Sequence, residues 1–464
     1  MKRLPAALLA FVVCMGLSGC QPSRSQRPAS DKTPSGEQTP SGEQPPNVLI
    51  FITDDQRAGT LDALPSVKRL FQEQGVSFPN AFATTPICCP SRATIMTGRY
   101  AHNHGVKYFQ PYKLDQRSTL QRHLAEAGYQ TGFFGKYLNG WSLADDPPYF
   151  DQWAVFPQSS PLIYSGGRWN VDGVVRRILS YSTHYLGRRI ESFLGSQERD
   201  EDASPWLLYV SVPAPHLPFV GEPHYKDAPV PAWKPNPALF DDVSDKPRYV
   251  AKRKARRCDL ECGRRTRRAQ YRALRPVDDL ITRVFDELQS LGESTSTLAF
   301  FTSDNGAHWG EFGLSGKRYP YRYSVRVPLL MRWPQRLRPR VDRRLVANLD
   351  IGPTVLDATG IEAADMDGRS LLERWKRPRL LLEHWGIPEV PQWASLVSKR
   401  FQYIEYYRGP RTSKPFGKEY YDLRRDKWQL HNLLADPSSL GRHKLRTLHL
   451  RLKQDRRCSE SSCP

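Results

Sequence analysis

Thr85-Pro86-Ile87-Cys88-Cys89-Pro90-Ser91-Arg92-Ala93-Thr94-Ile95-Met96-Thr97-Gly98-Arg99-Tyr100 is the stretch around which the rest of the chain can be interpreted. The ring of Pro90 fixes φ at a value that suits the first turn of a helix, so the stretch predicts a helix with Cys88 and Cys89 at its N-terminus. Free backbone N–H groups and the helix dipole favour an anion at such a position. Two cysteines before a helix can also be ordinary buried thiols, so the remaining sequence must decide.

Three short apolar runs, residues 47–53, 205–212 and 296–303, predict buried strands of an α/β sheet. Each run ends in polar residues that can carry chemistry. Because ligands of open α/β sheets bind at the carboxyl ends of the strands, we expect these polar residues to meet in one site. They are Asp54-Asp55 after the first run, His216 between prolines after the second, and Asp304-Asn305 after the third.

The segment Cys88-Cys89-Pro90-Ser91-Arg92 has the form Cys-x-Pro-Ser-Arg, which resembles the modification signal of the formylglycine-dependent (type I) sulfatases of the alkaline phosphatase superfamily. The resemblance implies that a formylglycine-generating enzyme oxidises Cys88 to formylglycine (3-oxoalanine) before folding. One hydroxyl of the aldehyde hydrate then attacks sulfur, and the other expels sulfate and restores the aldehyde. Cys89 fills the variable position of the signal.

The same resemblance extends to residues along most of the chain, from about residue 47 to residue 434. Asp54 and Asp55 look like the metal-binding pair of the family. With Asp304, Asn305 and an oxygen of modified Cys88, they imply an all-oxygen site that suits Ca²⁺ better than Mg²⁺ and argues against structural zinc.

Several further residues are nominated by the resemblance for catalysis. Lys136 lies in a segment similar to the lysine segment of the family, and Lys317 is the expected second cation for the sulfate. His216 matches the histidine that gives a proton to the leaving group, and Arg92 is expected to orient the hydrate. Second-rank pocket candidates are His104, Asn139 and His308.

Leu138 stands where many sulfatases have a histidine, two residues after the lysine. This departure matches the branch that includes N-acetylglucosamine-6-sulfatases and heparan endosulfatases. It favours a sulfated sugar substrate such as glucosamine 6-sulfate, alone or in a glycosaminoglycan. The competing functions are a phosphate or phosphonate monoester hydrolase on the same scaffold, and a catalytically silent surface lipoprotein that binds glycans.

The N-terminal region predicts export and anchoring. Residues 1–20 have the charged, apolar and small-residue regions of an export signal, and Leu17-Ser18-Gly19-Cys20 looks like a bacterial lipobox with Cys20 as the lipidated residue. An ordinary signal peptide is the alternative. Residues 21–46 are rich in Pro, Ser and Gly and predict a disordered tether, so we expect a lipid-anchored protein at the bacterial cell envelope.

Residues 47–378 are predicted to form the catalytic domain and residues 379–464 a C-terminal subdomain and tail. The expected fold is α/β, an alkaline-phosphatase-like mixed sheet sandwiched by helices. Helical periodicity is present in residues 64–74, 119–127 and 267–291. Short strand-like runs beyond residue 379 predict a smaller antiparallel sheet, followed by a helix near residues 438–452.

The remaining cysteines and the charge complete the sequence-based expectations. In an exported protein, Cys258 with Cys262 and Cys458 with Cys463 are expected to form local disulfides. Metal binding by the first pair is disfavoured by the neighbouring arginines. A formal net charge of +20 attracts polyanions such as sulfated polysaccharide, nucleic acid or an anionic membrane face, although a solvated basic surface explains it equally. We expect no specific nucleic-acid partner.

Overall fold

A computed structural model describes residues 44–156, 163–197, 204–252, 258–362, 365–409, 414–436 and 440–464. The export signal, Cys20 and most of the tether lie outside these residues, so the expectations for them stay predictions. Residues 44–464 form one compact unit, and the boundary expected near residue 378 also stays a prediction. Within the described ranges, no helix has the length and apolar composition needed to cross a membrane.

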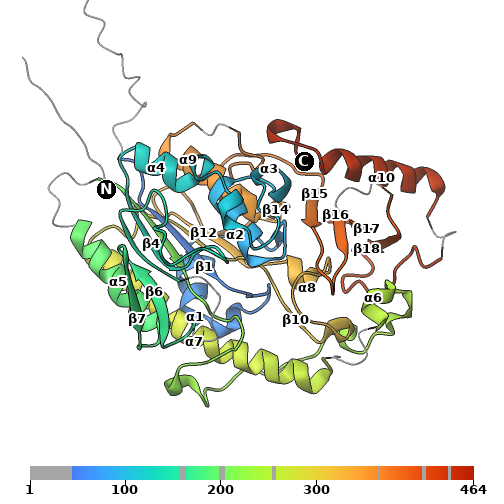
Figure 1. Cartoon of the computed structure of the whole chain (residues 1–464), viewed down its shortest axis with the longest axis horizontal. Helices are drawn as coiled ribbons and strands as arrows, with labels where there is room; N and C mark the ends of the chain where they lie inside the picture. The colour runs from blue at the N-terminus through green and yellow to red at the C-terminus, as the bar shows by residue number, and fades with distance from the viewer. Residues whose placement is uncertain are drawn as a thin grey trace, which may run out of the picture. The chain divides into compact units, whose positions relative to one another are not determined.

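The centre of the molecule is a 10-stranded mixed sheet (Figure 1). Its five central strands, β9, β1, β8, β4 and β5, are parallel. On one side β6 and β7 continue the sheet in antiparallel fashion, and on the other β12 is antiparallel to both β9 and β2, while β13 is parallel to β2. The strands in sheet order are β13 (Arg340–Val341), β2 (Val76–Ser77), β12 (Leu329–Arg332), β9 (Leu298–Ser303), β1 (Val48–Thr53), β8 (Trp206–Ser211), β4 (Gln130–Lys136), β5 (Gln152–Phe156), β6 (Gly167–Val171) and β7 (Val174–Ile178).

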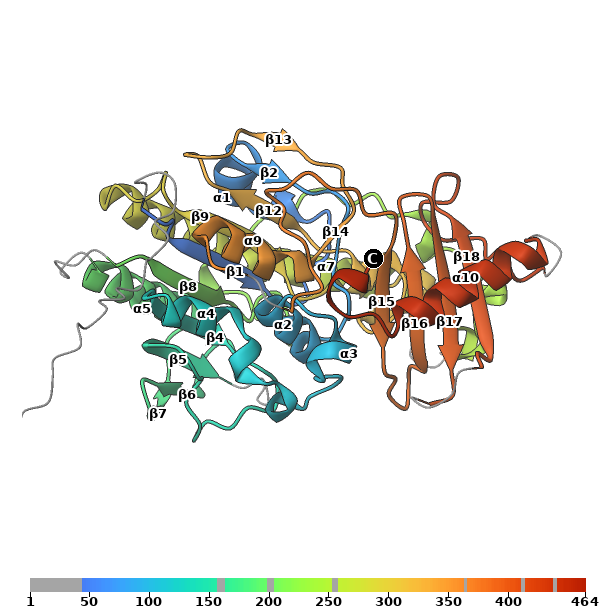
Figure 2. The same cartoon turned by 90° about the horizontal axis from the view of Figure 1, so that it is seen from above.

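Alternate residues of each central strand face two different layers of helices, so both faces of the sheet are buried. Val48, Ile50 and Ile52 of β1 pack with one layer, whereas Leu49 and Phe51 pack with the other. The first layer contains α2 (Cys88–Thr97), α4 (Leu120–Glu126) and α9 (Ile351–Thr359); the second contains α1 (Pro65–Val67), α5 (Ser182–Gln197) and α7 (Leu260–Ser290) (Figure 2).

A second sheet of four antiparallel strands follows in the chain, with α10 (Arg442–Asp455) lying across it (Figure 2). Its strands are β15 (Leu380–His384), β16 (Gln392–Val397), β17 (Phe401–Tyr407) and β18 (Gly417–Asp422). Two further two-stranded sheets pair β3 (Ala81–Phe82) with β14 (Val346–Ala347) and β10 (His308–Trp309) with β11 (Ser315–Gly316). The remaining short helices are α3 (Ala101–His104), α6 (Arg248–Ala251) and α8 (Arg322–Val325).

The predicted fold class is confirmed, including the helix-covered mixed sheet and the smaller antiparallel sheet. The elements differ from expectation in detail. The helix expected over residues 64–74 is α1 followed by a π-helical segment, Lys68–Gln72. The helix expected from residue 267 begins at Leu260, because the Asp259 side chain accepts a hydrogen bond from the Cys262 N–H at 2.8 Å and caps it.

Candidate active site

The carboxyl ends of three neighbouring strands carry the polar residues that the sequence indicated. Strands β9, β1 and β8 are adjacent and parallel, and the last residues of β1 and β9, Thr53 and Ser303, pair with each other. The chain therefore leaves all three strands at one edge of the sheet. The residues that follow are Asp54 and Asp55 after β1, Asp304 and Asn305 after β9, and His216 in the segment after β8.

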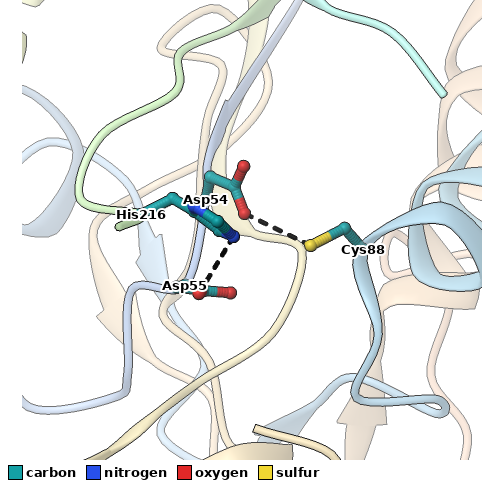
Figure 3. A group of neighbouring side chains, drawn as sticks. All are labelled: Asp54, Asp55, Cys88 and His216. Carbon is teal, nitrogen blue, oxygen red and sulfur yellow. Dashed lines mark hydrogen bonds and ion pairs between the residues drawn. The ribbon is translucent and has the colours of Figure 1, made fainter. Parts of the chain in front are cut away.

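Four side chains converge at this edge (Figure 3). One possible ligand atom from each of Asp54, Asp55, Cys88 and His216 lies within 4.8 Å of the others. Asp55 has a φ of 67°, a left-handed conformation that is uncommon for residues other than glycine. Such backbone conformations concentrate at functional sites, where the surrounding structure holds them.

Asp304 and Asn305 complete this group of oxygen atoms from the side of β9. The backbone N–H of Asp55 donates to Asp304 Oδ1 at 3.1 Å, and Asn305 Nδ2 donates to Asp55 Oδ1 at 2.6 Å. Asn305 Oδ1 is buried and has no hydrogen-bond partner among the described residues. A buried amide oxygen beside three carboxylates fits a hard cation such as calcium. His216 lies in the cluster as well, as expected for a residue that follows the second of the three strands.

The acids of the site are balanced by buried cations. Lys136 forms an ion pair with Asp54, and Lys317 forms one with Asp55 while its Nζ lies 3.9 Å from Asp54 Oδ1. Burial alone would raise the pKa of Asp54, but Lys136, His216 and Lys317 together hold that pKa well below its usual range. The pKa of Asp55 is lowered in the same way against burial, chiefly by Lys317. Both acids are therefore charged at neutral pH.

Cys88 is the first residue of α2, a helix whose ten residues are all buried. Its Sγ lies 3.4 Å from Asp54 Oδ1 and 2.6 Å from Lys317 Nζ. Burial and the charges of Asp304 and Asp54 raise the pKa of the Cys88 thiol far above its usual value, so the unmodified side chain stays protonated. Cys89 Sγ instead lies 3.6 Å from the carbonyl oxygen of Asn139, away from the acids.

Arg92 lies one helical turn after Cys88 and supports the acids. Its Nε and Nη2 lie 3.0 and 2.9 Å from Asp304 Oδ2, and its Nη1 donates to the carbonyl oxygen of Lys136 at 3.0 Å. Its Nη2 also lies 3.7 Å from Asp54 Oδ2. Because Asp54 contacts Cys88 Sγ, the expectation that Arg92 orients the Cys88 side chain takes an indirect form, through the positions of Asp54 and Asp304.

Lys136 reaches the site because the preceding glycine lets two strands approach closely. A Cβ added to Gly135, which has a φ of 124°, would lie 1.9 Å from the carbonyl oxygen of Ser211 on β8. Only glycine fits that contact. Lys136 follows directly at the end of β4, where its side chain is fully buried against Asp54.

His216 points its Nε2 toward Asp55, with 3.7 Å between that nitrogen and Oδ2. Its Nδ1 lies 2.7 Å from the carbonyl oxygen of Leu217, which can only accept a hydrogen bond. Nδ1 therefore carries a proton, and Nε2 is the nitrogen that can exchange a proton within the site. The side chain is 21% exposed, so it also reaches solvent.

The three second-rank candidates occupy different surroundings. His104 is buried, with Nε2 at 3.1 Å from Thr94 Oγ1 and Nδ1 accepting from the N–H of Val106 at 3.2 Å, so its partners belong to the scaffold. His308 Nδ1 lies near Ser324 Oγ and the Gly316 carbonyl oxygen. The structure does not bring either histidine into the cluster around Cys88. Asn139 contributes its backbone carbonyl oxygen to Cys89.

Two serines that the sequence did not single out hold the site together. Ser91 Oγ donates to the carbonyl oxygen of Asp304 and accepts from Asn348 Nδ2 at 2.9 Å. Ser211 Oγ donates to the Lys136 carbonyl oxygen at 2.8 Å and accepts from Arg92. Ser91 belongs to the Cys-x-Pro-Ser-Arg segment, which was the one available signal for its importance. No sequence signal marked Ser211, since a serine at a strand end is common.

The predicted local disulfides are present. Cys258 pairs with Cys262, and Cys458 pairs with Cys463. Among the described residues, Cys88 and Cys89 are the free thiols. The thiols available for chemistry are therefore those of the α2 segment.

Comparison with known proteins gives a consistent family. A sequence model described as "Sulfatase" matches residues 46–361, and one described as "N-sulphoglucosamine sulphohydrolase, C-terminal" matches residues 310–457. An extracellular sulfatase SULF-1 homolog of Drosophila melanogaster is 34% identical over 73% of this chain, which spans 32% of that longer protein. The N-acetylglucosamine-6-sulfatase of Capra hircus is 30% identical over 90% of this chain and 84% of its own length.

A solved structure gives the same architecture. It is a protein in complex with its substrate, D-glucosamine-2-N,6-O-disulfate, and it superposes with a TM-score of 0.75. The match covers 89% of this chain and 97% of that chain, at 21% sequence identity. At that identity, the likeness establishes the fold.

Proposed function

Because the chain belongs to the sulfatase family, and is therefore a sulfuric ester hydrolase, we propose that it removes sulfate from a sugar of the glucosamine 6-sulfate type. The observation that carries the proposal is the convergence of Cys88, Asp54 and Lys317 at the N-terminus of α2. Relatives named N-acetylglucosamine-6-sulfatase and N-acetylglucosamine-6-O-sulfatase support the sugar. The sugar can be free or part of a glycosaminoglycan.

We propose that Cys88 acts after conversion to formylglycine by a formylglycine-generating enzyme. When present, the hydrated aldehyde supplies an oxygen nucleophile for sulfur and a route for sulfate release. Two features support the proposal. Burial raises the pKa of the unmodified thiol, which makes it a poor nucleophile, and its Sγ lies 2.6 Å from Lys317 Nζ, a cation that would bind a sulfate ester. The N-terminal N–H groups of α2 favour the anionic substrate at the same place.

A calcium ion is the metal that these residues would hold, through the carboxylates of Asp54, Asp55 and Asp304 and the amide oxygen of Asn305. When bound, it supplies a Lewis acid that polarises sulfate oxygens. The donor set contains hard oxygen ligands, and the partnerless Asn305 Oδ1 is a buried acceptor suited to a cation. Magnesium fits less well because it demands a tighter octahedral set.

The protein side chains bind the charge and move the proton. Lys136 and Lys317 place two ammonium groups around the position of Cys88 Sγ, where negative charge develops on sulfate oxygens. His216 holds Nδ1–H on the Leu217 carbonyl oxygen, which fixes the ring with Nε2 facing the site. From there a protonated Nε2 can deliver its proton to the departing sugar hydroxyl oxygen.

This proposal is tested by the chemical state of Cys88, by turnover of different substrates, and by a Cys88→Ala variant. Intact-mass analysis of the Cys88 peptide should show the mass of formylglycine in protein co-expressed with the modifying enzyme. That protein should release sulfate from glucosamine 6-sulfate and turn over nitrophenyl sulfate faster than nitrophenyl phosphate, whereas Cys88→Ala should lose sulfate release and keep its thermal transition. Faster turnover of the phosphate would favour a phosphate or phosphonate monoester hydrolase. An unmodified Cys88 with glycan binding alone would favour a silent surface lipoprotein.

We also propose that the protein is exported and anchored to the cell envelope through a lipid on Cys20. The sequence of residues 1–20 supports this proposal, and the tether over residues 21–46 gives the enzyme reach from the membrane. Full-length protein from a bacterial host should partition into detergent, and Cys20→Ala should release it to the aqueous phase. Equal partitioning of both proteins would contradict the anchor and favour an ordinary signal peptide.

A further inference from the structure

A basic pocket of about 250 Å³ lies between the segment after α3, the end of β15 and the last turn of α10. Four cationic side chains line it: Lys107, Lys453, Arg456 and Arg457. Lys453 and Arg457 are exposed. Within the part of the chain that the structure describes, none of the four has a carboxylate partner. The pocket therefore offers positive charge that the protein itself does not neutralise.

The acids beside the pocket are already paired. Each carboxylate oxygen of Glu383 lies 3.0 Å from Nδ1 of His102. Glu405 lies 2.8 Å from Nδ1 of His449 and accepts from the hydroxyl of Tyr407 at 2.6 Å. Because these carboxylates are engaged, the free charge of the pocket is cationic, which favours an anionic ligand.

His384 supplies a second and independent indication of a ligand. It lines the pocket, is 1% exposed, and has no hydrogen-bond partner at either ring nitrogen among the described residues. Burial and the charge of Arg318 lower the pKa of His384 to about 3, so the ring is neutral and carries one N–H donor. Buried polar groups in native proteins normally have partners, so a ligand oxygen that accepts this hydrogen bond would satisfy it.

The pocket is also connected to the wall of the active site. Trp393 lines the pocket, and its Nε1 donates to the carbonyl oxygen of Arg318 at 2.9 Å. The residue before Arg318 is Lys317, whose Nζ lies 2.6 Å from Cys88 Sγ. One side chain thus joins the pocket to the segment that carries a sulfate-binding lysine. Trp385 adds an aromatic ring, with Lys107 Nζ 5.2 Å from its centroid, a combination that suits a sugar ring bearing an anionic group.

We propose that this pocket is an accessory subsite for a sulfate or carboxylate group on a sugar unit neighbouring the one that is hydrolysed. The proposal rests on the proposed function and deepens it, since it makes a polyanionic oligosaccharide the preferred substrate over a monosaccharide. Lys453 and Arg457 attract the anionic group at the rim, and His384 donates to it inside. The same chemistry also fits an anionic lipid headgroup, so the test includes vesicles.

The test removes two charges from the pocket, at the end of α10 and just beyond it, and, as a control, two from the start of α10, outside the pocket. Lys453→Ala/Arg457→Ala changes the rim, whereas Arg442→Ala/Lys444→Ala removes the same charge from exposed positions of the first turn of α10. Binding of a heparin-derived hexasaccharide is measured by calorimetry in a Cys88→Ala background. We expect about tenfold weaker binding for the rim pair, from two exposed charge contacts, and at most about twofold for the control pair.

A third variant, His384→Leu, tests the inside of the pocket at similar side-chain volume. We expect it to weaken hexasaccharide binding as well, while its thermal transition and near-UV circular dichroism report whether it is folded. The proposal would be overturned if folded His384→Leu bound the hexasaccharide with full affinity. It would also be overturned if the rim and control pairs lost equal affinity, because the effect would then come from general surface charge. If the rim pair lost binding to phosphatidylglycerol vesicles and kept its hexasaccharide binding, the proposal would be overturned in favour of a membrane contact.

Turnover separates this proposal from the proposed function. In formylglycine-containing enzyme, the ratio of kcat/KM for the hexasaccharide to kcat/KM for glucosamine 6-sulfate should fall about tenfold in the rim pair and stay unchanged in the control pair. Failure of every form to release sulfate would refute the proposed function, and calorimetry would still test the pocket. An unchanged ratio with normal sulfate release would refute the subsite alone.

Discussion

Replacing Arg92 by alanine should destabilise the protein strongly, and calcium should reduce that loss. The guanidinium makes two contacts with Asp304, at 3.0 and 2.9 Å, and one hydrogen bond to the Lys136 carbonyl oxygen. Both Arg92 and Asp304 are buried. Removing one partner of a buried pair costs about 3–5 kcal/mol of the free energy of unfolding, because the remaining charge is left without compensation.

A bound cation would take over part of that compensation. In the variant, Asp304 has no guanidinium beside it, so calcium at Asp54, Asp55 and Asp304 should bind relatively more tightly. We expect the loss caused by Arg92→Ala to be smaller in calcium than in EDTA by about 1–3 kcal/mol, the usual size of a coupling between two sites. Urea unfolding of wild type and variant under both conditions gives the four free energies needed.

Arg57→Ala is the matched control for this experiment. Arg57 pairs with buried Glu311 at 2.9 Å, and among the described residues it forms no ion pair with Asp54, Asp55 or Asp304. Its replacement should also be destabilising, but by the same amount in calcium and in EDTA. The reasoning would be refuted if Arg92→Ala lost less than about 1 kcal/mol in EDTA, or if its loss were as insensitive to calcium as that of the control.

Two further predictions concern pH and backbone packing. Burial raises the pKa of Glu419 from 4.5 to about 7, despite hydrogen bonds from Tyr421 and Tyr406, so the stability it contributes is present below pH 4.5 and is lost as the pH rises through about 7. Glu419→Gln should therefore flatten the fall in thermal midpoint over that range, and an unchanged slope would contradict the raised pKa. Gly306→Ala should cost about 2 kcal/mol or more, because its Cβ would lie 2.2 Å from the Tyr323 carbonyl oxygen. Gly195→Ala, with nothing within 4 Å, should be neutral or slightly stabilising in the same thermal melts, and equal losses would contradict the steric argument.

The sequence predicted those parts of the fold whose signal is local. The runs that became β1, β8 and β9 are continuous and apolar, so both their burial and the polar residues at their ends could be recognised. Strand β7 was missed because Arg176 and Arg177 interrupt its apolar pattern, and its residues are mostly exposed at the sheet edge. Helix α7 was predicted to begin too late, since its first turns carry arginines and depend on the cap by Asp259.

The candidate site was predictable at the level of its reactive groups and less so at the level of their partners. Cys88, Asp54 and Asp304 stand in recognisable segments. The pairing of Arg92 with Asp304 joins residues 212 positions apart, and only the packing of α2 against the end of β9 produces it. The role of Ser211 and the unpartnered ring of His384 could not be predicted either. The sequence shows neither how deeply a side chain is buried nor whether its hydrogen bonds are satisfied.

The burial of α2 has a consequence for how the enzyme is made. Cys88 is 1% exposed, on a helix with no exposed residue, so a second enzyme cannot reach its side chain once this layer has packed. If activity needs an aldehyde at that position, whether a molecule becomes active is decided during biosynthesis. Later treatment of the folded protein with the modifying enzyme cannot activate a molecule that folded unmodified. Two preparations of the same sequence can thus differ in specific activity. The difference is set by the fraction of molecules in which Cys88 was converted before packing.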